Sequence, residues 1–140
     1  MWHKLKSIAF HLSTYADLAP DLRLRRQVNQ SLHTRPSLAS EEWYDYFWRP
    51  RKISHEISTF VYTHLEQYSG LQVSRVLPSD RLDEDLKMTL VCWFDWNLTL
   101  CEDFQHCFAV DISDRLDINT LSTVEDFVLF LNHQLLLLKR

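Results

Sequence analysis

The chain has 140 residues, of which 46% are hydrophobic and 13% aromatic, a composition that argues against intrinsic disorder and fits one domain with an ordinary core. One glycine and four prolines make tight hairpins and glycine-rich phosphate loops improbable and favour helices joined by short polar turns. The net charge of −4 is uneven, because residues 1–52 carry nine Lys/Arg and five Asp/Glu whereas residues 53–140 carry six and fourteen, and this acidic half argues against nucleic-acid binding.

The sequence shows no pattern typical of a membrane-spanning or secreted protein. None of its segments approaches the ~20 apolar residues that a membrane-spanning helix needs. The first apolar run is interrupted by His11 and Ser13, and no small-residue cleavage site follows, so it does not resemble a signal peptide. Three cysteines, Cys92, Cys101 and Cys107, suit a reducing compartment better than a disulfide framework. We therefore expect a cytoplasmic protein with no transmembrane segment.

Residues 1–50 are predicted to form an N-terminal helical extension. A first helix is expected at about residues 2–15, where apolar side chains at helical spacing form one face. This face either packs on the protein or a partner, or lies on a membrane surface. A later helix is expected from an N-cap at Ser40, and its dense aromatic side chains at residues 43–48 either pack onto the rest of the chain or form an exposed patch for a partner.

A second helix is predicted between these two, with Asp21 as its N-cap. Its apolar side chains recur at four-residue steps and predict its buried face: Leu24, Val28 and Leu32. It also carries a basic patch made of Arg23, Arg25 and Arg26. This patch is either a solvated helix face or a surface for an acidic partner.

Residues 51–140 are predicted to form a helical bundle. A helix is expected at about residues 53–68, with an apolar stripe along one face and Gly70 just beyond its end. After a loop, apolar side chains repeat every three or four residues and predict one long helix over residues 83–108, whose first turn is either continuous with it or separate. The repeat consists of Leu86, Leu90, Phe94, Leu98, Cys101, Phe104 and Phe108. Residues 111–119 are expected to be a polar loop with a brief helix. The stretch from Ser122 to Glu125 has the S-x-x-E pattern of a capping box and is expected to open the last helix.

The order of these elements from Ile53 onward resembles the acyl carrier protein fold. Three strings carry the resemblance: Leu82-Asp83-Glu84-Asp85-Leu86, Phe108-Ala109-Val110-Asp111-Ile112-Ser113-Asp114, and Leu121-Ser122-Thr123-Val124. The chain is also similar to a little-studied bacterial family of small carrier-like proteins of unknown function. The resemblance covers about residues 53–137. It implies an all-α, carrier-like four-helix bundle, here preceded by the N-terminal helical extension.

The sequence departs from this family at the residue that matters most for carrier activity. Acyl carrier proteins have a serine at the start of their second helix, and phosphopantetheine is attached to its hydroxyl. Alignment on Asp85 and Leu86 places Leu90 at this position, and alignment on Ile112 places Phe94 there. Thr89 is the only nearby hydroxyl and is a poor candidate for attachment. The resemblance therefore implies a carrier-like protein without the phosphopantetheine cofactor.

No other motif in the sequence predicts catalysis or a metal site. The spacing of Cys92, Cys101, His106 and Cys107 does not match a zinc knuckle or ribbon, and we interpret the cysteines as free thiols. None of the seven histidines pairs with a serine or cysteine in a recognisable nucleophile motif. We therefore expect neither enzymatic activity nor a bound metal.

The leading hypothesis is a non-enzymatic protein that binds another protein with a basic face. The expected docking surface is the start of the long predicted helix, made of Asp83, Glu84, Asp85, Lys87, Trp93 and Trp96. Two alternatives stay open: a true acyl or thioester carrier that uses Thr89, and an immunity or adaptor protein for a secreted toxin.

Overall fold

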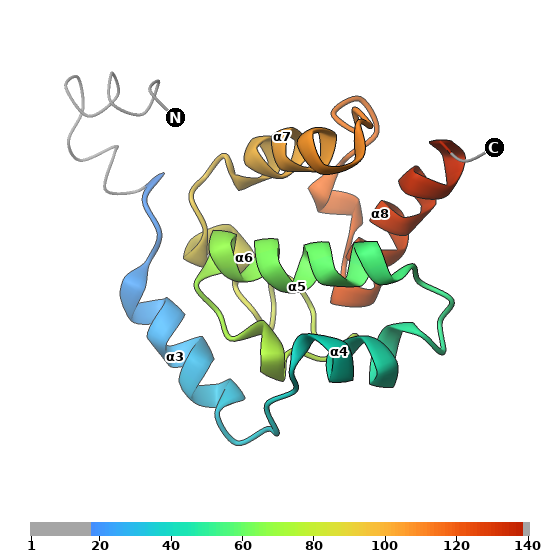
Figure 1. The fold of residues 1–140 in the computed structure, drawn as a ribbon. Coiled ribbons are helices and arrows are strands. Elements are labelled where there is room, and N and C mark those ends of the chain that lie inside the picture. Colours follow the sequence, from blue (N-terminus) through green and yellow to red (C-terminus); the bar gives the residue numbers. More distant parts are fainter. Residues whose placement is uncertain (1–17, 139–140) are drawn as a thin grey trace.

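The computed structural model describes residues 18–138, and these form an all-helical structure (Figure 1). Its elements are α3 (Leu22–Leu32), α4 (Ser40–Trp43), the π-helical turn η1 (Tyr44–Trp48), α5 (His55–Ser69), η2 (Val73–Arg75), α6 (Met88–Val91), α7 (Trp96–Phe108), η3 (Ile118–Thr120) and α8 (Val124–Leu138). The described residues contain no β-strand, only an isolated bridge between Arg81 and Thr123. The prediction of an all-α fold is therefore confirmed for this part of the chain. The helix expected at residues 2–15 lies outside it.

Side chains fix the ends of several helices, partly as the sequence predicts. The predicted N-cap at Ser40 is wrong, because Ser40 is the first residue of α4 and the N-cap is Ala39, whose N–H donates to Glu42 Oε1 at 2.8 Å. Asp21 Oδ1 accepts a hydrogen bond from the Leu24 N–H at 3.0 Å and caps α3. Ser54 Oγ accepts one from the Ile57 N–H at 3.3 Å and caps α5, which ends at Gly70 in the left-handed conformation. The capping box of α8 lies one residue later than predicted, since Thr123 and Asp126 bond each other's backbone N–H groups at 3.1 and 3.2 Å.

The long helix predicted over residues 83–108 is wrong, because the chain forms two helices there. Residues 83–87 are a turn, α6 has four residues, and the backbone is extended at Cys92 before α7 begins at Trp96. Asp83 accepts hydrogen bonds from the N–H and hydroxyl of Thr89, so its side chain ends the turn instead of continuing a helix. The Arg25 guanidinium donates to the Val91 carbonyl at 2.8 Å and satisfies the end of α6.

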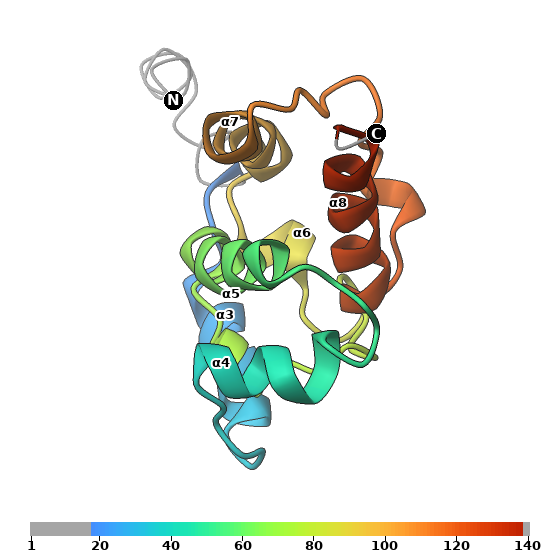
Figure 2. The same ribbon diagram turned by 45° about the vertical axis from the view of Figure 1, so that its right-hand side comes forward.

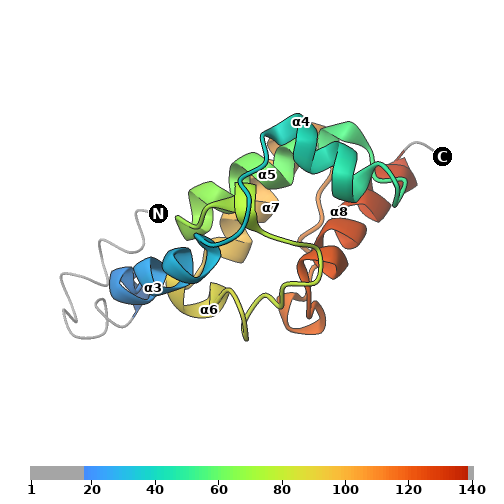
Figure 3. The ribbon, with the colours of Figure 1, turned by 90° about the horizontal axis from the view of Figure 1, so that it is seen from below.

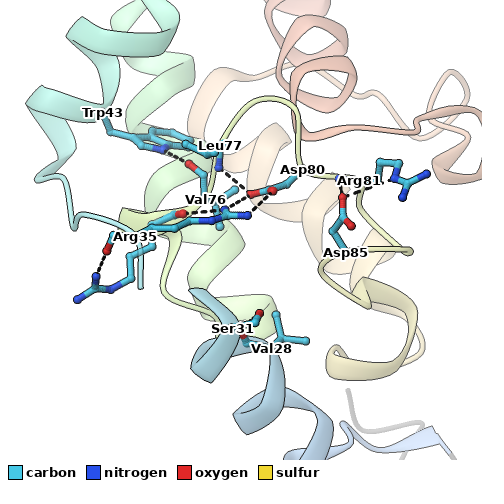
Figure 4. Close-up of polar contacts among 10 residues, drawn as sticks. Val28, Ser31, Arg35, Trp43, Val76, Leu77, Asp80, Arg81 and Asp85 are labelled. Carbon is cyan, nitrogen blue, oxygen red and sulfur yellow. Dashed lines mark hydrogen bonds and ion pairs between the residues drawn. The ribbon is translucent and has the colours of Figure 1, made fainter. Parts of the chain in front are cut away.

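Helix α5 occupies the middle of the structure, with α7 on one side and α4 on the other, and α8 contacts α5 at a steep angle to it (Figures 1 and 2). Two tryptophans of the α4 region are fully buried, Trp43 and Trp48, with ring centroids 5.4 Å apart. The indole N–H of Trp43 donates to the Val76 carbonyl at 2.9 Å (Figure 4). The buried indole N–H of Trp43 therefore has an acceptor, and burial of the two rings removes a large apolar surface from water. Trp43 and Trp48 thus pack onto the rest of the chain.

Residues 18–50 are tied to the rest of the chain by polar contacts as well. Arg35 forms a bidentate ion pair with Asp80, at 2.7 and 2.9 Å, and Asp80 also accepts the Leu77 N–H at 2.8 Å (Figure 4). Asn29 donates to the Gly70 carbonyl and accepts the Gln72 N–H. Buried apolar side chains on both sides of residue 50 belong to one core cluster. The division into units at 1–50 and 51–140 stays a prediction.

Helix α3 packs against the short helix α6. Figure 3 shows α3 and α6 side by side at the end of the molecule away from α8. Val28 and Leu32 supply the buried face of α3, as predicted, whereas the basic patch on this helix is divided. Arg25 turns inward to α6, while Arg23 and Arg26 are exposed. Part of the predicted patch therefore has a structural role in holding α3 on α6.

Candidate functional site

The expected acidic docking residues form an exposed turn that is partly neutralised by its own neighbours. Glu84 pairs with Arg81 at 2.5 Å, and Asp85 Oδ2 accepts the Arg81 backbone N–H at 2.8 Å (Figure 4). This N–H bond, reinforced by the charge of the guanidinium, holds the pKa of Asp85 below its usual value. Lys87 is half-buried in a left-handed conformation with φ of 58°. The turn is acidic, but Arg81 pairs with two of its three carboxylates, those of Glu84 and Asp85.

Thr89, the only candidate for covalent attachment, lies near the start of α6 with its side chain already engaged. Its hydroxyl and backbone N–H both donate to Asp83 Oδ1. A carboxylate this close to the hydroxyl would repel the negatively charged phosphodiester of a phosphopantetheine arm. The surroundings of Thr89 therefore do not favour its use as an attachment residue.

Thr89 also borders a hollow whose accessible wall is mostly polar but which has three large exposed apolar side chains around it. This hollow has a volume of about 410 Å³, and its walls come from the segment before α3 and from residues on either side of α6: Leu18, Ala19, Pro20, Asp21, Leu22, Thr89, Leu90, Cys92 and Phe94. Three of these side chains, Leu22, Leu90 and Phe94, are 58%, 54% and 46% exposed. Large apolar side chains at such exposure are normal singly, but three around one hollow are typical of a binding surface. We call Leu22, Leu90 and Phe94 the apolar rim.

Backbone hydrogen bonds hold the two walls of this hollow together. The Asp21 N–H donates to the Leu90 carbonyl at 2.9 Å, and the Phe94 N–H donates to the Leu18 carbonyl at 3.2 Å. The sequence analysis missed the apolar rim because it assigned Leu90 and Phe94 to the buried stripe of a continuous helix. The break after α6 turns these side chains outward and buries Met88, Val91 and Cys92 instead.

The two expected docking tryptophans line a different pocket, between the end of α5 and the start of α7. This pocket has a volume of about 260 Å³ and is lined by Gln67, Tyr68, Trp93, Trp96, Thr99 and Asp103. Trp93 is half-buried, whereas Trp96 is only 6% exposed and packs against Phe127 on another side, at 6.3 Å between ring centroids. Trp96 therefore offers little surface to a partner outside the pocket, and we remove it from the expected docking face.

A hydrogen bond between Tyr68 and Asp103 links the two helices that form this pocket. The Tyr68 hydroxyl donates to Asp103 Oδ2 at 2.5 Å, and the Tyr68 and Trp96 rings lie 6.2 Å apart. Burial, together with this hydrogen bond, raises the pKa of Tyr68 well above its ordinary value, so the hydroxyl stays a donor. Tyr68 and Asp103, which are 35 positions apart, were not predicted from the sequence as site residues. The only available signal was the spacing of Trp96, Thr99 and Asp103 on one helix face.

The three cysteines lie in different surroundings. Cys92 is buried, and burial raises the pKa of its thiol to about 12. Cys101 is half-buried and Cys107 is exposed. Within residues 18–138, no three His, Cys, Asp or Glu side chains gather as they would around a metal ion. The same part of the chain has no helix with the length and apolar character needed to cross a membrane.

Comparison with known proteins gives no match. No protein-family model matches the sequence, and neither a curated protein nor a solved structure is similar to it. The assignment of a function therefore depends on the chemistry of the site.

Proposed function

We propose that this chain is a non-enzymatic protein-binding module with a carrier-like arrangement of helices, and that a partner protein docks on the apolar rim and the adjacent acidic turn. The proposal rests on Leu90 and Phe94, the two positions that align with the attachment serine of acyl carrier proteins. Both Leu90 and Phe94 expose a large apolar side chain, at 54% and 46%. Where a carrier would present a hydroxyl for modification, this chain presents side chains suited to bury against another protein.

The charges around the apolar rim define the chemistry of the partner. Asp21 lines the hollow, and Asp83 is hydrogen-bonded to Thr89, which also lines it. Glu84 and Asp85 are exposed in the same turn as Asp83. We therefore expect the partner surface to present apolar side chains that pack against the apolar rim, flanked by Lys or Arg side chains that meet these carboxylates.

The order of the helices supports the carrier-like part of the proposal. The longer helices α5, α7 and α8 and the short turn η3 follow one another as a long helix, a second helix, a brief helix and a last helix. A loop of 26 residues, which holds η2 and α6, separates α5 from α7. The first α7 residue, Trp96, comes two positions after Phe94, so the alignment on Ile112 places the missing serine just before this helix.

Site-specific photo-crosslinking tests where the partner docks. A photoreactive phenylalanine analogue at position 94 is expected to crosslink a partner in cells, and the same analogue at Leu136 serves as the control. Leu136 is 50% exposed on α8, at the opposite end of the molecule from α3 and α6 (Figure 3). Crosslinks from position 94 only to residues 2–15 or to a second copy of this chain would overturn the proposal.

Titration of the identified partner, once purified, tests the energetics of docking. We expect Phe94→Ser to weaken binding by about 30-fold, since a central apolar anchor contributes about 2 kcal/mol or more. Leu136→Ser should leave binding unchanged, and Glu84→Lys should weaken it and reduce its salt dependence. Wild-type affinity in the Phe94→Ser variant would refute docking on the apolar rim.

Intact mass distinguishes the two alternative functions. After co-expression with a broad-specificity phosphopantetheinyl transferase, we expect the mass to stay that of the unmodified chain. An added arm mapped to Thr89 would instead establish a carrier. If the crosslinked partner is a basic secreted toxin, the protein is an immunity or adaptor protein, which is a specific form of the proposed protein-binding function.

A further inference from the structure

The aromatic pocket between α5 and α7 has a chemistry of its own, distinct from the apolar rim. Three aromatic side chains, Tyr68, Trp93 and Trp96, line it together with the carboxylate of Asp103. We propose that this pocket binds the guanidinium group of an arginine side chain. The proposed function supplies the source of that arginine, a partner with a basic face, but the pocket's affinity for guanidinium can be measured without the partner.

The pocket favours a cation because of the charges that its walls present. The faces of aromatic rings carry partial negative charge and attract a cation placed over them, most strongly for tryptophan. Asp103 adds a full negative charge, and the remaining two wall residues, Gln67 and Thr99, are neutral. Among residues 18–138, the six that line the pocket include no cation, so they combine π faces and a carboxylate without a positive side chain.

Guanidinium fits these walls better than the ammonium group of lysine. Its plane can stack on an indole, and its weaker hydration lowers the cost of entering a partly enclosed pocket. Its N–H groups can also bond a carboxylate in a forked geometry. The Tyr68 hydroxyl holds Asp103 Oδ2 at 2.5 Å and thereby fixes the plane of this carboxylate. A fixed carboxylate beside half-buried Trp93 is the arrangement that a planar cation requires.

Core packing alone does not account for all of this arrangement. Packing explains Trp96, which is 6% exposed and contacts Phe127. Tyr68 and Trp93 are only half-buried and lie around an open hollow of about 260 Å³ with a carboxylate in its wall, which leaves room for a ligand.

Titration with short peptides, followed by the indole N–H signals in two-dimensional NMR of the ¹⁵N-labelled full chain, tests the proposal. The probes are acetyl-Gly-Arg-Gly-amide and acetyl-Gly-Lys-Gly-amide, and Trp93→Phe assigns one of the signals. We expect the arginine peptide to shift the Trp93 and Trp96 signals saturably, with at least threefold higher affinity than the lysine peptide. The signals of Trp43 and Trp48, which are fully buried elsewhere, should not move.

Variants of α7 separate cation binding from a general effect on folding. Asp103→Asn keeps an acceptor for the Tyr68 hydroxyl but removes the charge, and should weaken arginine binding roughly tenfold. Glu102→Gln is the matched control, because this neighbouring acid is exposed and is not part of the pocket. No saturable shift, equal affinity for the two peptides, or an Asp103→Asn variant that binds as the wild type would each overturn the proposal.

The outcome is independent of docking on the apolar rim. Leu90→Ser removes an apolar rim side chain that is not part of the aromatic pocket, so this variant should bind the arginine peptide as the wild type does. If the arginine peptide binds but Phe94→Ser binds the partner with wild-type affinity, docking on the apolar rim is refuted and the assignment of the pocket is supported. If the partner responds to Phe94→Ser but no peptide binds, the pocket assignment fails alone.

Discussion

Replacing the single glycine with alanine tests how α3 is held against the end of α5. Gly70 has φ of 69°, a left-handed conformation that costs an L-residue about 1 kcal/mol. Three other residues adopt the same conformation without being glycine, Lys52, Lys87 and Ala109, so strain alone does not demand glycine here. The second constraint is space, because a Cβ on residue 70 would lie 2.5 Å from Cδ of Arg25.

The loss of stability expected for Gly70→Ala has two contributions, backbone strain and displacement of the Arg25 side chain. The Arg25 side chain would have to move, and its hydrogen bond to the Val91 carbonyl, 2.8 Å long, would be lost or weakened. A part-buried hydrogen bond from a charged donor contributes about 1 to 1.5 kcal/mol. With backbone strain of about 1 kcal/mol, we expect Gly70→Ala to lower the free energy of unfolding by about 2 kcal/mol.

A double-mutant cycle with Arg25→Ala separates strain from crowding. In the Arg25→Ala background only strain remains, so Gly70→Ala should cost about 1 kcal/mol there. The free energies come from urea unfolding followed by tryptophan fluorescence, with the slope checked for a constant two-state transition. If Gly70→Ala costs the same in both backgrounds, the side chain of Arg25 does not constrain residue 70 and the reasoning is refuted.

Three further predictions address other regions. Ala109→Gly should raise the free energy of unfolding by about 1 kcal/mol, because Ala109 has φ of 58° at the exposed end of α7; a loss of stability in the same urea assay would contradict this. Iodoacetamide should alkylate Cys107 first and Cys92 last in the native protein, since Cys92 is buried with a raised thiol pKa; peptide mass spectrometry that finds the reverse order would be inconsistent with the fold. The folded pKa of Tyr68 is raised above its unfolded value near 10, so its contribution to stability is present below pH 10 and is lost as pH rises further. Above pH 10 the wild type should therefore lose stability more steeply than Tyr68→Phe, and parallel curves would argue against the raised pKa.

Local sequence signals predicted the helices whose ends are fixed by adjacent residues. Asp21 caps α3 and Gly70 ends α5, because each needs only a neighbour three or four residues away, whereas the Ser54 cap of α5 was not predicted. The same kind of local signal did not predict the structure of residues 83–108. Their apolar spacing fits one helix, but the side chain of Asp83 and the guanidinium of Arg25 favour a break. Arg25 is 66 residues from Val91, so the contact between them could not be predicted from the local spacing of residues.

The candidate site was only partly predictable for the same reason. The sequence grouped Trp93, Trp96 and the acidic residues into one expected docking surface at the start of a long helix. The structure instead assigns the tryptophans to a pocket completed by Tyr68 and Asp103. It assigns Leu90 and Phe94 to a hollow completed by residues 18–22.

The sequence by itself determined the all-α class, the Asp21 cap of α3 and the end of α5 at Gly70. These properties depend on residue identity and on contacts within one or two turns. The tertiary structure alone decided which apolar side chains are buried and which are exposed around α6. A repeat of apolar residues shows that a helix has an apolar face, but the partners of that face come from distant parts of the chain. Here α6 packs against α3, Met88 and Val91 are buried, and Leu90 and Phe94 remain exposed as part of the proposed docking surface.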